Sequence, residues 1–177
     1  FYGYYMLEGL AREGRFEEAV DIVKKYWGGM LNLGATTFWE DFDYDDLARA
    51  SRIDSIVPAG KFDIHADRGT NCYKGLRMSL CHGWASGVTA WLSRYVLGIM
   101  PTEAGFRSVT IEPHLAGCNE VLGSFPTPFG VITVNHRRAA DGTIYSIVEA
   151  PEGVRVTLKG AVAKGNIKTD RKTEEQD

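Results

Sequence analysis

The hydrophobic period of this chain changes once, near residue 100, and this change constrains the fold more than any other feature. Before it, apolar residues recur every three or four positions, a spacing that places them on one face of an α-helix. Two such rows are Phe16, Val20, Val23 and Trp27, and Leu80, Trp84, Val88, Trp91 and Tyr95. After it, apolar and polar residues alternate in short runs, which is typical of half-buried β-strands. We therefore expect an α+β chain with helices first and strands second.

Three helices are expected before residue 100. The first covers about residues 2–12 and ends at Gly14, and Arg15 opens the second. This gives an αα-hairpin of the kind that is stacked in helical barrels and solenoids. The third begins near Ser79, whose hydroxyl is suited to cap it. The stretch before it, residues 41–78, shows little periodicity, and a loop of that length is usually functional or mobile.

Five short strands are expected after the helices, joined by turns into a small antiparallel sheet or β-sandwich. Their ranges are 106–111, 120–125, 131–136, 143–148 and 154–158. Residues 126–130 (PTPFG) and the pair Asp141-Gly142 supply the proline, aspartate and glycine with which a backbone reverses. Strands within about 60 residues bury only a modest core, so we expect them to form an accessory domain.

The expected domain organisation follows from this change of period. Residues 1–100 form a helical part, residues 101–163 a β-domain and residues 164–177 a polar tail. The tail has almost nothing to bury, so we expect it to fray. The chain starts at Phe1 without a methionine or a charged leader, so we expect it to begin inside a longer protein whose localisation stays undetermined.

The composition fits a folded chain and excludes several kinds of partner. Of the 177 residues, 44% are hydrophobic and 24% are charged, and no window approaches the roughly 20 apolar residues of a membrane span. A net charge of −3 with scattered basic residues leaves no footprint for nucleic acid. The three cysteines, Cys72, Cys81 and Cys118, have no zinc-site spacing, and we expect neither a metal nor a cofactor.

A first candidate site lies in residues 34–43 (GATTFWEDFD), where aromatic side chains and carboxylates are mixed. Sugars present apolar ring faces to aromatics and hydroxyls to acceptors, so this mixture suits a carbohydrate site centred on Glu40. The alternative is structural. Thr37-x-x-Glu40 fits a helix capping box, in which the glutamate bonds back to the cap backbone, and the local pattern alone favours that interpretation.

Two metal interpretations fit poorly. Asp41, Asp43 and Asp45 alternate like the start of a calcium loop, but the sixth and twelfth positions of that loop are aspartate and arginine instead of glycine and glutamate. A solvated acidic turn is the better interpretation. His65 and Asp67 with Cys72 nearby do not form a recognised ligand spacing either.

A second candidate site lies at His82, which we expect in the first turn of the third helix. There the helix dipole favours a neutral imidazole that can bond a hydroxyl, and the alternative is a histidine bonded to nearby backbone. Cys81 cannot act as a nucleophile with His82, since adjacent helical side chains diverge. Trp84 and Trp91, at helical spacing, are expected in the core.

Three segments, in this order, strongly resemble bacterial α-L-rhamnosidases of the inverting glycoside hydrolase type, family 78. They are residues 34–40 (GATTFWE), 79–87 (SLCHGWASG) and 91–99 (WLSRYVLGI). The resemblance covers about residues 1–140. It implies that the chain holds the last helices of an (α/α)6 barrel, followed by a small antiparallel β-sandwich.

Later motifs extend the resemblance. Pro101 with residues 105–107 (GFR) and 111–114 (IEPH) resembles that family's exit from the barrel into its C-terminal β-domain. Residues 127–130 (TPFG) resemble a recurring turn of its sheet. Two departures are a longer loop between Glu40 and His82, and a cysteine at position 81 where a small polar residue is more familiar.

The resemblance also implies roles for single residues. Glu40 matches the general base that activates water, His82 matches a histidine lining the sugar subsite, and Trp39 is expected to shape the same wall. Inverting hydrolysis needs a second carboxyl, a general acid, and nothing in this chain resembles it. We therefore expect the chain to need the N-terminal domains of the same protein, to bind a rhamnose-containing glycan with them, and to be inactive alone.

Two other functions stay open. One is a different glycosidase on the same barrel, since a fold does not settle a specificity. The other is a non-catalytic carbohydrate-binding or structural module. Helix faces left uncovered by the missing barrel also favour self-association of the chain.

Overall fold

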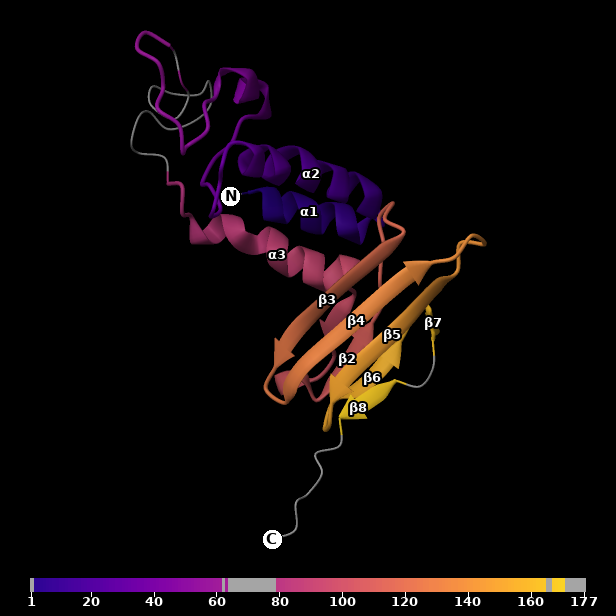
Figure 1. The fold of residues 1–177 in the computed structure, drawn as a ribbon. Helices are drawn as coiled ribbons and strands as arrows, with labels where there is room; N and C mark the ends of the chain where they lie inside the picture. Colours follow the sequence, from indigo (N-terminus) through magenta and orange to yellow (C-terminus); the bar gives the residue numbers. More distant parts are fainter. Residues whose placement is uncertain (1, 62, 64–78, 165–166, 171–177) are drawn as a thin grey trace. The chain divides into compact units, whose positions relative to one another are not determined.

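The computed structural model describes residues 2–61, 63, 79–164 and 167–170 (Figure 1). The chain forms two compact units, residues Phe1–Thr89 and Ala90–Asp177. Each unit is described by itself below. His65, Asp67 and Cys72, which were considered above as metal ligands, lie outside the described residues.

The first unit opens with the predicted αα-hairpin. Helix α1 spans Gly3–Arg12 and helix α2 spans Phe16–Asn32, and Arg15 is the N-cap residue of α2, as predicted. The Arg15 guanidinium also binds the Glu18 carboxylate one turn into the helix, with Nε to Oε1 at 2.8 Å. The two helices bury small and apolar side chains, namely Leu7, Ala11, Ala19, Val20 and Met30.

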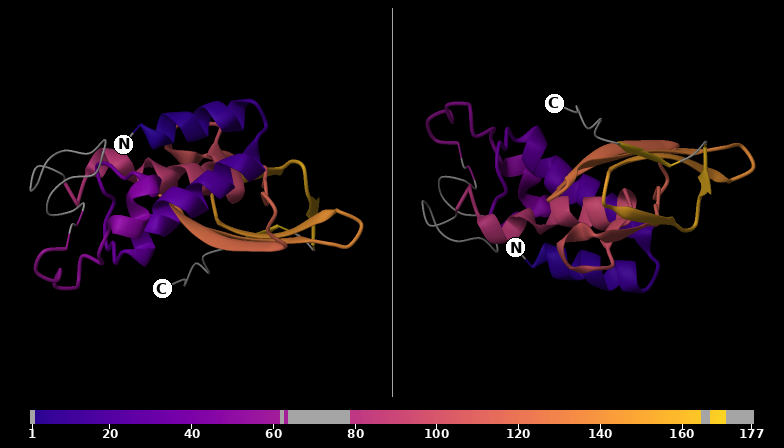
Figure 2. Two further views of the ribbon diagram at one scale, coloured as in Figure 1. Left: turned by 90° about the horizontal axis from the view of Figure 1, so that it is seen from above. Right: turned by 90° about the horizontal axis from the view of Figure 1, so that it is seen from below.

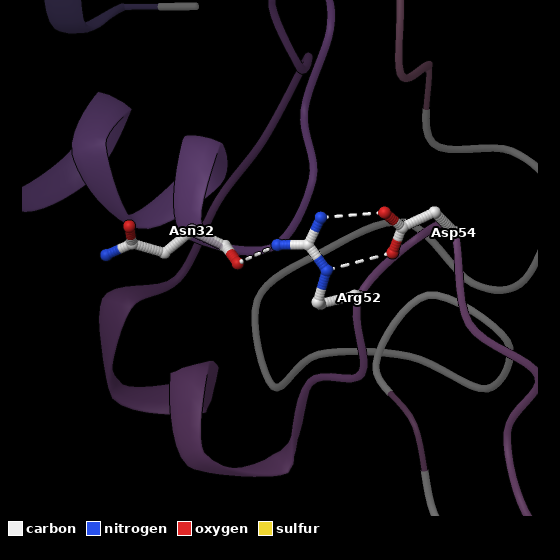
Figure 3. Close-up of polar contacts among 3 residues, drawn as sticks. All are labelled: Asn32, Arg52 and Asp54. Carbon is white, nitrogen blue, oxygen red and sulfur yellow. Dashed lines mark hydrogen bonds and ion pairs between the residues drawn. The ribbon is translucent and has the colours of Figure 1, made fainter.

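The chain after α2 is fixed to the end of that helix by an arginine. Arg52 donates two hydrogen bonds to the Asp54 carboxylate, at 2.9 and 2.7 Å, and a third to the carbonyl of Asn32, at 2.8 Å (Figure 3). The backbone N–H of Ile53 donates to the carbonyl of Leu33 at 2.9 Å. Carbonyls at a helix C-terminus lack partners within the helix, so these two bonds satisfy them. They hold the segment around residue 53 beside the end of α2.

The third helical run starts later than the sequence predicts. A 3-10 turn spans Gly83–Ser86, helix α3 spans Gly87–Trp91, and a π-helical turn spans Leu92–Val96. The predicted start at Ser79 is wrong, because the backbone of Ser79 bonds to Glu40 and the backbone at His82 is extended. The Ser79 hydroxyl instead accepts the N–H of Cys81 at 3.2 Å, within a turn.

The second unit consists mainly of two sheets. One has the order β1-β2-β6, with β1 at Ile99–Pro101, β2 at Ser108–Ile111 and β6 at Arg155–Leu158. In the other, the order is β3-β4-β5-β7, and β8 also pairs with β5. Its strands are β3 Glu120–Thr127, β4 Gly130–Arg138, β5 Ile144–Pro151, β7 Val162–Ala163 and β8 Lys168–Asp170. The long strands β3, β4 and β5 form one curved layer (Figure 2).

The predicted α+β class is confirmed, but the prediction of purely antiparallel strands is wrong. Strands β3, β4 and β5 pair antiparallel through tight hairpins, whereas β6 pairs parallel to β2, and β7 and β8 pair parallel to β5. A tight hairpin forces antiparallel pairing. Strand β6 joins the other sheet after β5, so no hairpin sets its direction. Both sheets are consequently mixed.

The two sheets share one hydrophobic core. It contains Ile99, Val109, Ile111, Ile132, Val134, Val148, Ala150 and Val154, which come from both sheets and the turn before β6. Successive side chains of a strand point to opposite faces of its sheet. In strand β4, for example, Ile132, Val134 and His136 are buried at alternate positions. The sequence alternation that predicted the strands is thus the pattern of this core.

Both predicted turns are present. The hydroxyl of Thr127 donates to the carbonyl of Gly130 at 2.8 Å between β3 and β4. Between β4 and β5, the Asp141 carboxylate accepts the N–H of Thr143 at 2.9 Å, and Gly142 has a φ of 86°. Side-chain acceptors and glycine stabilise such reversals.

The prediction of a frayed tail over residues 164–177 is wrong for residues 167–170. Ile167 packs against the hydrophobic core, and β8 pairs with β5, so that Glu149 lies opposite Lys168. The Nζ of Lys168 donates to the Glu149 carboxylate at 3.3 Å. One apolar residue and a strand of three residues carry too little periodicity to be recognised in a polar sequence.

A buried histidine makes the second unit sensitive to acid. His136 is 0% exposed, with Nε2 3.1 Å from the carbonyl of Leu97 and Nδ1 2.6 Å from the Ser146 hydroxyl. A carbonyl only accepts, so Nε2 carries the proton and neutral Nδ1 accepts from Ser146. Burial lowers the pKa of His136, and the bond to Leu97 opposes this only partly. Burial likewise lowers the pKa of His114.

The pKa of a histidine in the unfolded chain is about 6.5. We expect the free energy of unfolding to have its largest value above that pH and to decrease as the pH is lowered further. In that range the unfolded chain binds more protons than the folded one. Urea denaturation at pH 7.5 and pH 5.5 measures the loss. The variant His136→Gln, whose amide keeps a donor and an acceptor, should lose less between these pH values than the parent chain. An equal loss in both would contradict the role of His136 and leave His114 as the source.

Candidate active site

Two distant segments of the first unit pair along their backbones, and they carry both predicted site residues. The N–H of Glu40 donates to the carbonyl of Ser79 at 2.9 Å, and the N–H of His82 donates to the carbonyl of Phe38 at 2.7 Å. The Thr37 hydroxyl donates to the carbonyl of Leu80. We call residues 37–40 and 79–82 the paired segments. Their pairing brings the neighbourhoods of Glu40 and His82 together, although Glu40 and Ser79 are 39 positions apart in the sequence.

The side chain of Glu40 takes part in the same pairing. Its Oε2 accepts the backbone N–H of Ser79 at 3.0 Å. The capping box predicted as an alternative for Thr37 and Glu40 is wrong, because no helix starts there and both side chains bond to the other segment. The Glu40 carboxylate is half-buried and accepts the Ser79 N–H.

Glu40 lines a cavity of about 530 Å³ within the first unit. The other lining residues come from α1, α2, the segment after α2 and the third helical run: Tyr2, Gly3, Met6, Tyr26, Trp27, Met30, Trp39, Asp41, Phe42 and Ala85. The lining is mostly aromatic and aliphatic, with two carboxylates. Ligand sites commonly combine such an apolar wall with a few polar groups that fix orientation. The cavity offers a sugar both an aromatic wall for its apolar ring face and carboxylates for its hydroxyls.

Trp39 is the best buried member of this wall. It is 1% exposed and packs in a cluster with Met30, Leu33 and Phe42. Its ring meets that of Phe42 edge to face, with centroids 6.0 Å apart. Trp39 therefore lines the cavity beside the neighbouring Glu40. Its contact with a substrate stays a prediction.

His82 lies one residue before a short helical turn instead of within a first turn. It is the N-cap residue of the 3-10 turn Gly83–Ser86, with an extended backbone and no side-chain cap bond. Its ring is half-buried and lies 6.4 Å from that of Trp84, nearly perpendicular to it. The dipole argument for a neutral ring therefore does not apply, and its contact with a sugar stays a prediction.

The two tryptophans expected in the core differ. Trp91 is 0% exposed, as predicted, whereas Trp84 is 77% exposed, so the prediction for Trp84 is wrong. The reason is the late start of the helical run. Trp84 lies in the 3-10 turn, where the apolar row of the later helix does not continue.

The acidic residues after Glu40 form turns. The Asp43 carboxylate accepts the N–H of Asp45 at 3.0 Å and caps the 3-10 helix η1 at Tyr44–Arg49. The Asp41 carboxylate accepts the N–H of Phe42 at 2.9 Å. Among the residues that the structure describes, no three His, Cys, Asp or Glu side chains gather as a metal site would need. No helix in the described part of the chain is both long and apolar enough to span a bilayer.

Sequence reasoning missed three features of the first unit, two of them at the candidate site. The cavity is lined by residues of both early helices, including Tyr2 and Tyr26, which periodicity assigns only to a helix face. Asp63 is buried and accepts the N–H of Ser51 at 2.6 Å, in a stretch without periodicity. The amide of Ser79 bonds Glu40, and a backbone group has no sequence signal. The local signal for this region was the mixture of aromatics and carboxylates around Glu40.

Comparison with solved structures gives the fold first. The chain resembles part of the GH78 family rhamnosidase of Bacillus sp. GL1, with a TM-score of 0.62 and 20% identity over 94% of this chain and 15% of the other. It also resembles part of the Streptomyces avermitilis α-L-rhamnosidase solved with L-rhamnose, with a TM-score of 0.61 and 22% identity over 86% and 13%. The chain therefore has the fold of a region of these two solved enzymes.

Sequence comparison then identifies the family that the chain resembles. Residues 98–174 match the bacterial alpha-L-rhamnosidase C-terminal domain, and the predicted resemblance is confirmed. The α-L-rhamnosidase of Streptomyces avermitilis is 26% identical over 71% of the chain, and that of Alteromonas sp. strain LOR is 28% identical over 68%. The chain spans about a tenth of the length of these relatives, 10% and 11%.

Proposed function

We propose that this chain is part of an enzyme that removes terminal α-L-rhamnose from glycosides or polysaccharides by inverting hydrolysis. The observation that carries the proposal is the Glu40 carboxylate, held by the N–H of Ser79 at the edge of an aromatic cavity. Relatives named α-L-rhamnosidase and a related structure solved with L-rhamnose supply the substrate class. Glu40 is the general base in this proposal.

The chemistry follows from the pair of carboxyl groups that such a reaction uses. Glu40 takes a proton from a water, whose oxygen attacks the anomeric carbon from the face opposite the leaving group. The glycosidic C–O bond breaks, and a protonated carboxyl on the other side gives its proton to the leaving oxygen. The two carboxyls stand about 6.5–9.5 Å apart to admit the water. In our proposal the acid lies in a part of the enzyme outside this chain.

Two further residues complete the proposed sugar site. His82 bonds a rhamnose hydroxyl from the start of its helical turn, and Trp39 forms the wall that fixes the sugar face. The paired segments support this assignment, since they hold His82 close in the backbone to Phe38, next to Trp39. Removing a single such hydroxyl contact weakens binding, whereas loss of Glu40 removes the chemical step itself.

We also propose that residues 1–100 are the last helices of an (α/α)6 barrel and residues 101–163 a C-terminal β-sandwich. Exposed apolar side chains in the first unit support this, because a soluble surface rarely gathers them. They include Tyr2, Tyr5, Met6, Leu31, Ile56 and Trp84, each at least 45% exposed. Further barrel helices would cover these side chains. Without those helices, the same side chains favour self-association of residues 1–177, which gel filtration measures.

The longer natural protein that contains this sequence should hydrolyse an aryl α-L-rhamnoside, and residues 1–177 alone should not. The reason is the missing acid, without which the leaving group departs unprotonated. Proton NMR during turnover should show β-L-rhamnose as the first product, which then mutarotates. Retention of the α-anomer, or robust turnover by residues 1–177, would contradict the proposal.

Calorimetry with L-rhamnose distinguishes this enzyme from a carbohydrate-binding module. An incomplete sugar site should bind weakly or not at all in residues 1–177, and binding should appear in the longer protein. Strong binding by residues 1–177 with no hydrolysis by the longer protein would favour the module. Hydrolysis of another glycoside, with none of the rhamnoside, would favour a different barrel glycosidase.

A further inference from the structure

We propose that the backbone amide of Ser79 is the positioning group of the catalytic site, fixing the carboxylate of Glu40 in the orientation that takes a proton from water. This rests on the proposed function and adds a group that acts through the base. Ser79 does not touch the substrate in this proposal. Its contribution comes from the main chain and not from its side chain.

The contact is reciprocal, which distinguishes it from a chance hydrogen bond. The Glu40 N–H donates to the Ser79 carbonyl at 2.9 Å, and the Ser79 N–H donates back to the Glu40 Oε2 at 3.0 Å. One residue thus binds both the main chain and the side chain of the other. The first bond fixes the position of the Glu40 backbone, and the second fixes the position of its carboxylate.

Neighbouring bonds keep the Ser79 amide in place. The carbonyl of Leu80 accepts the Thr37 hydroxyl, and the carbonyl of Phe38 accepts the His82 N–H at 2.7 Å. The Ser79 hydroxyl accepts the N–H of Cys81 at 3.2 Å. The segment that contains this amide is therefore held by several hydrogen bonds, so the amide can orient the Glu40 side chain without moving with it.

A glutamate base needs such a guide. Its three side-chain torsions give it many rotamers, and an unguided carboxylate spends only part of its time facing the attacking water. An N–H bond to Oε2 fixes the direction and plane of the carboxylate before the substrate arrives. Misplacement of a reacting group by about 1 Å can cost about 100-fold in rate. Positioning therefore affects the rate of the chemical step more than substrate binding.

The test compares Ser79→Pro with Ser79→Ala in the longer natural protein. Proline lacks the N–H, whereas alanine keeps it and removes only the hydroxyl. We expect Ser79→Pro to lower kcat on an aryl α-L-rhamnoside by about 10- to 100-fold with KM changed less than about threefold. Ser79→Ala should keep most of the activity. Equal kcat in the two variants would overturn the proposal.

Azide separates a misplaced base from a damaged fold. As an anion it attacks the anomeric carbon without losing a proton, forming a C–N bond as the C–O bond breaks, so it needs no general base. Azide should therefore raise turnover of Ser79→Pro and yield the inverted rhamnosyl azide, with little effect on the parent enzyme. A loss of activity that azide does not restore would indicate a structural role and overturn the proposal.

Thr37→Val covers the case in which the proline variant does not fold. It removes the bond to the Leu80 carbonyl and loosens the paired segments while all amides remain. The same pattern is expected at smaller size: lower kcat, steady KM and restoration by azide. Unchanged kcat in this variant, with Ser79→Pro unfolded, would count against positioning.

Crystal structures of the two Ser79 variants give a readout that does not depend on the reaction. Glu40 should keep one rotamer in Ser79→Ala and adopt others in Ser79→Pro. If the parent enzyme has no rhamnosidase activity, the proposed function fails. The rotamers then still decide whether Ser79 orients Glu40, and one shared rotamer in both variants overturns that.

Discussion

Replacing Glu40 with glutamine should lower kcat on an aryl α-L-rhamnoside by about 10²- to 10⁴-fold, the range that a general base contributes. The amide oxygen of glutamine can still accept the Ser79 N–H, which Oε2 accepts at 3.0 Å in the parent chain. The paired segments should therefore keep their geometry, and thermal unfolding should change little. What the amide cannot do is take a proton from water. Steady-state kinetics and calorimetry on the longer natural protein measure both properties.

The matched control is Asp45→Asn, which makes the same chemical change five residues later. Asp45 is exposed, and only its backbone N–H is bonded in the turn at Asp43, so its replacement should leave kcat within about twofold. Near-parental activity of Glu40→Gln would exclude Glu40 as the base. A large loss in Asp45→Asn would show that charge in this region, and not one carboxylate, controls the rate.

Replacing Gly98 with alanine should destabilise the second unit by about 2–5 kcal/mol, the sum of a left-handed backbone and forced overpacking. Gly98 has a φ of 71°, and a Cβ there would lie 2.3 Å from the backbone carbonyl carbon of Glu112 and 2.5 Å from the nitrogen of Pro113. Backbone atoms cannot turn aside as a side chain can. The Gly98 carbonyl also accepts the Glu112 N–H at 3.0 Å, at the entrance to strand β1. Urea denaturation of residues 1–177 measures the loss.

Gly142→Ala isolates the part of that loss due to crowding. Gly142 also has a positive φ, 86°, but a Cβ there meets nothing within 4 Å. It should cost only about 1–2 kcal/mol for the left-handed conformation. If the two variants are equally stable, the close approach of Gly98 to Glu112 is not what requires glycine at position 98.

The regular elements of the fold could be predicted because local sequence determines them. Helix α2 follows from three- and four-residue apolar spacing, and the end of α1 follows from Gly14. Strands β3, β4 and β5 follow from alternation between turns with glycine or proline. Strands β7 and β8 have two and three residues, too few for any period to show. Their parallel pairing depends on contacts with β5 that no local pattern records. Pairing direction is a tertiary property wherever no hairpin imposes it.

The candidate site could be predicted only in part, for a related reason. Its residue types pointed to Glu40, but the local pattern Thr37-x-x-Glu40 favoured a helix cap. In the structure both side chains bond to the segment 79–82 instead. The predicted start of the third helix at Ser79 was wrong for the same reason, because the backbone of Ser79 bonds to Glu40. Local rules fail where a distant segment supplies the partner.

The amide of Ser79 also bears on how related sequences should be compared. Every amino acid except proline supplies the same N–H, so position 79 can vary freely in side chain while its function is kept. What must be preserved is the register between residues 37–40 and 79–82, which sets the amide opposite the Glu40 carboxylate. An insertion or deletion of one residue inside either segment would break that register, even with Glu40 and His82 intact. In our proposal, an active homologue therefore keeps the spacing of these motifs as well as their residues.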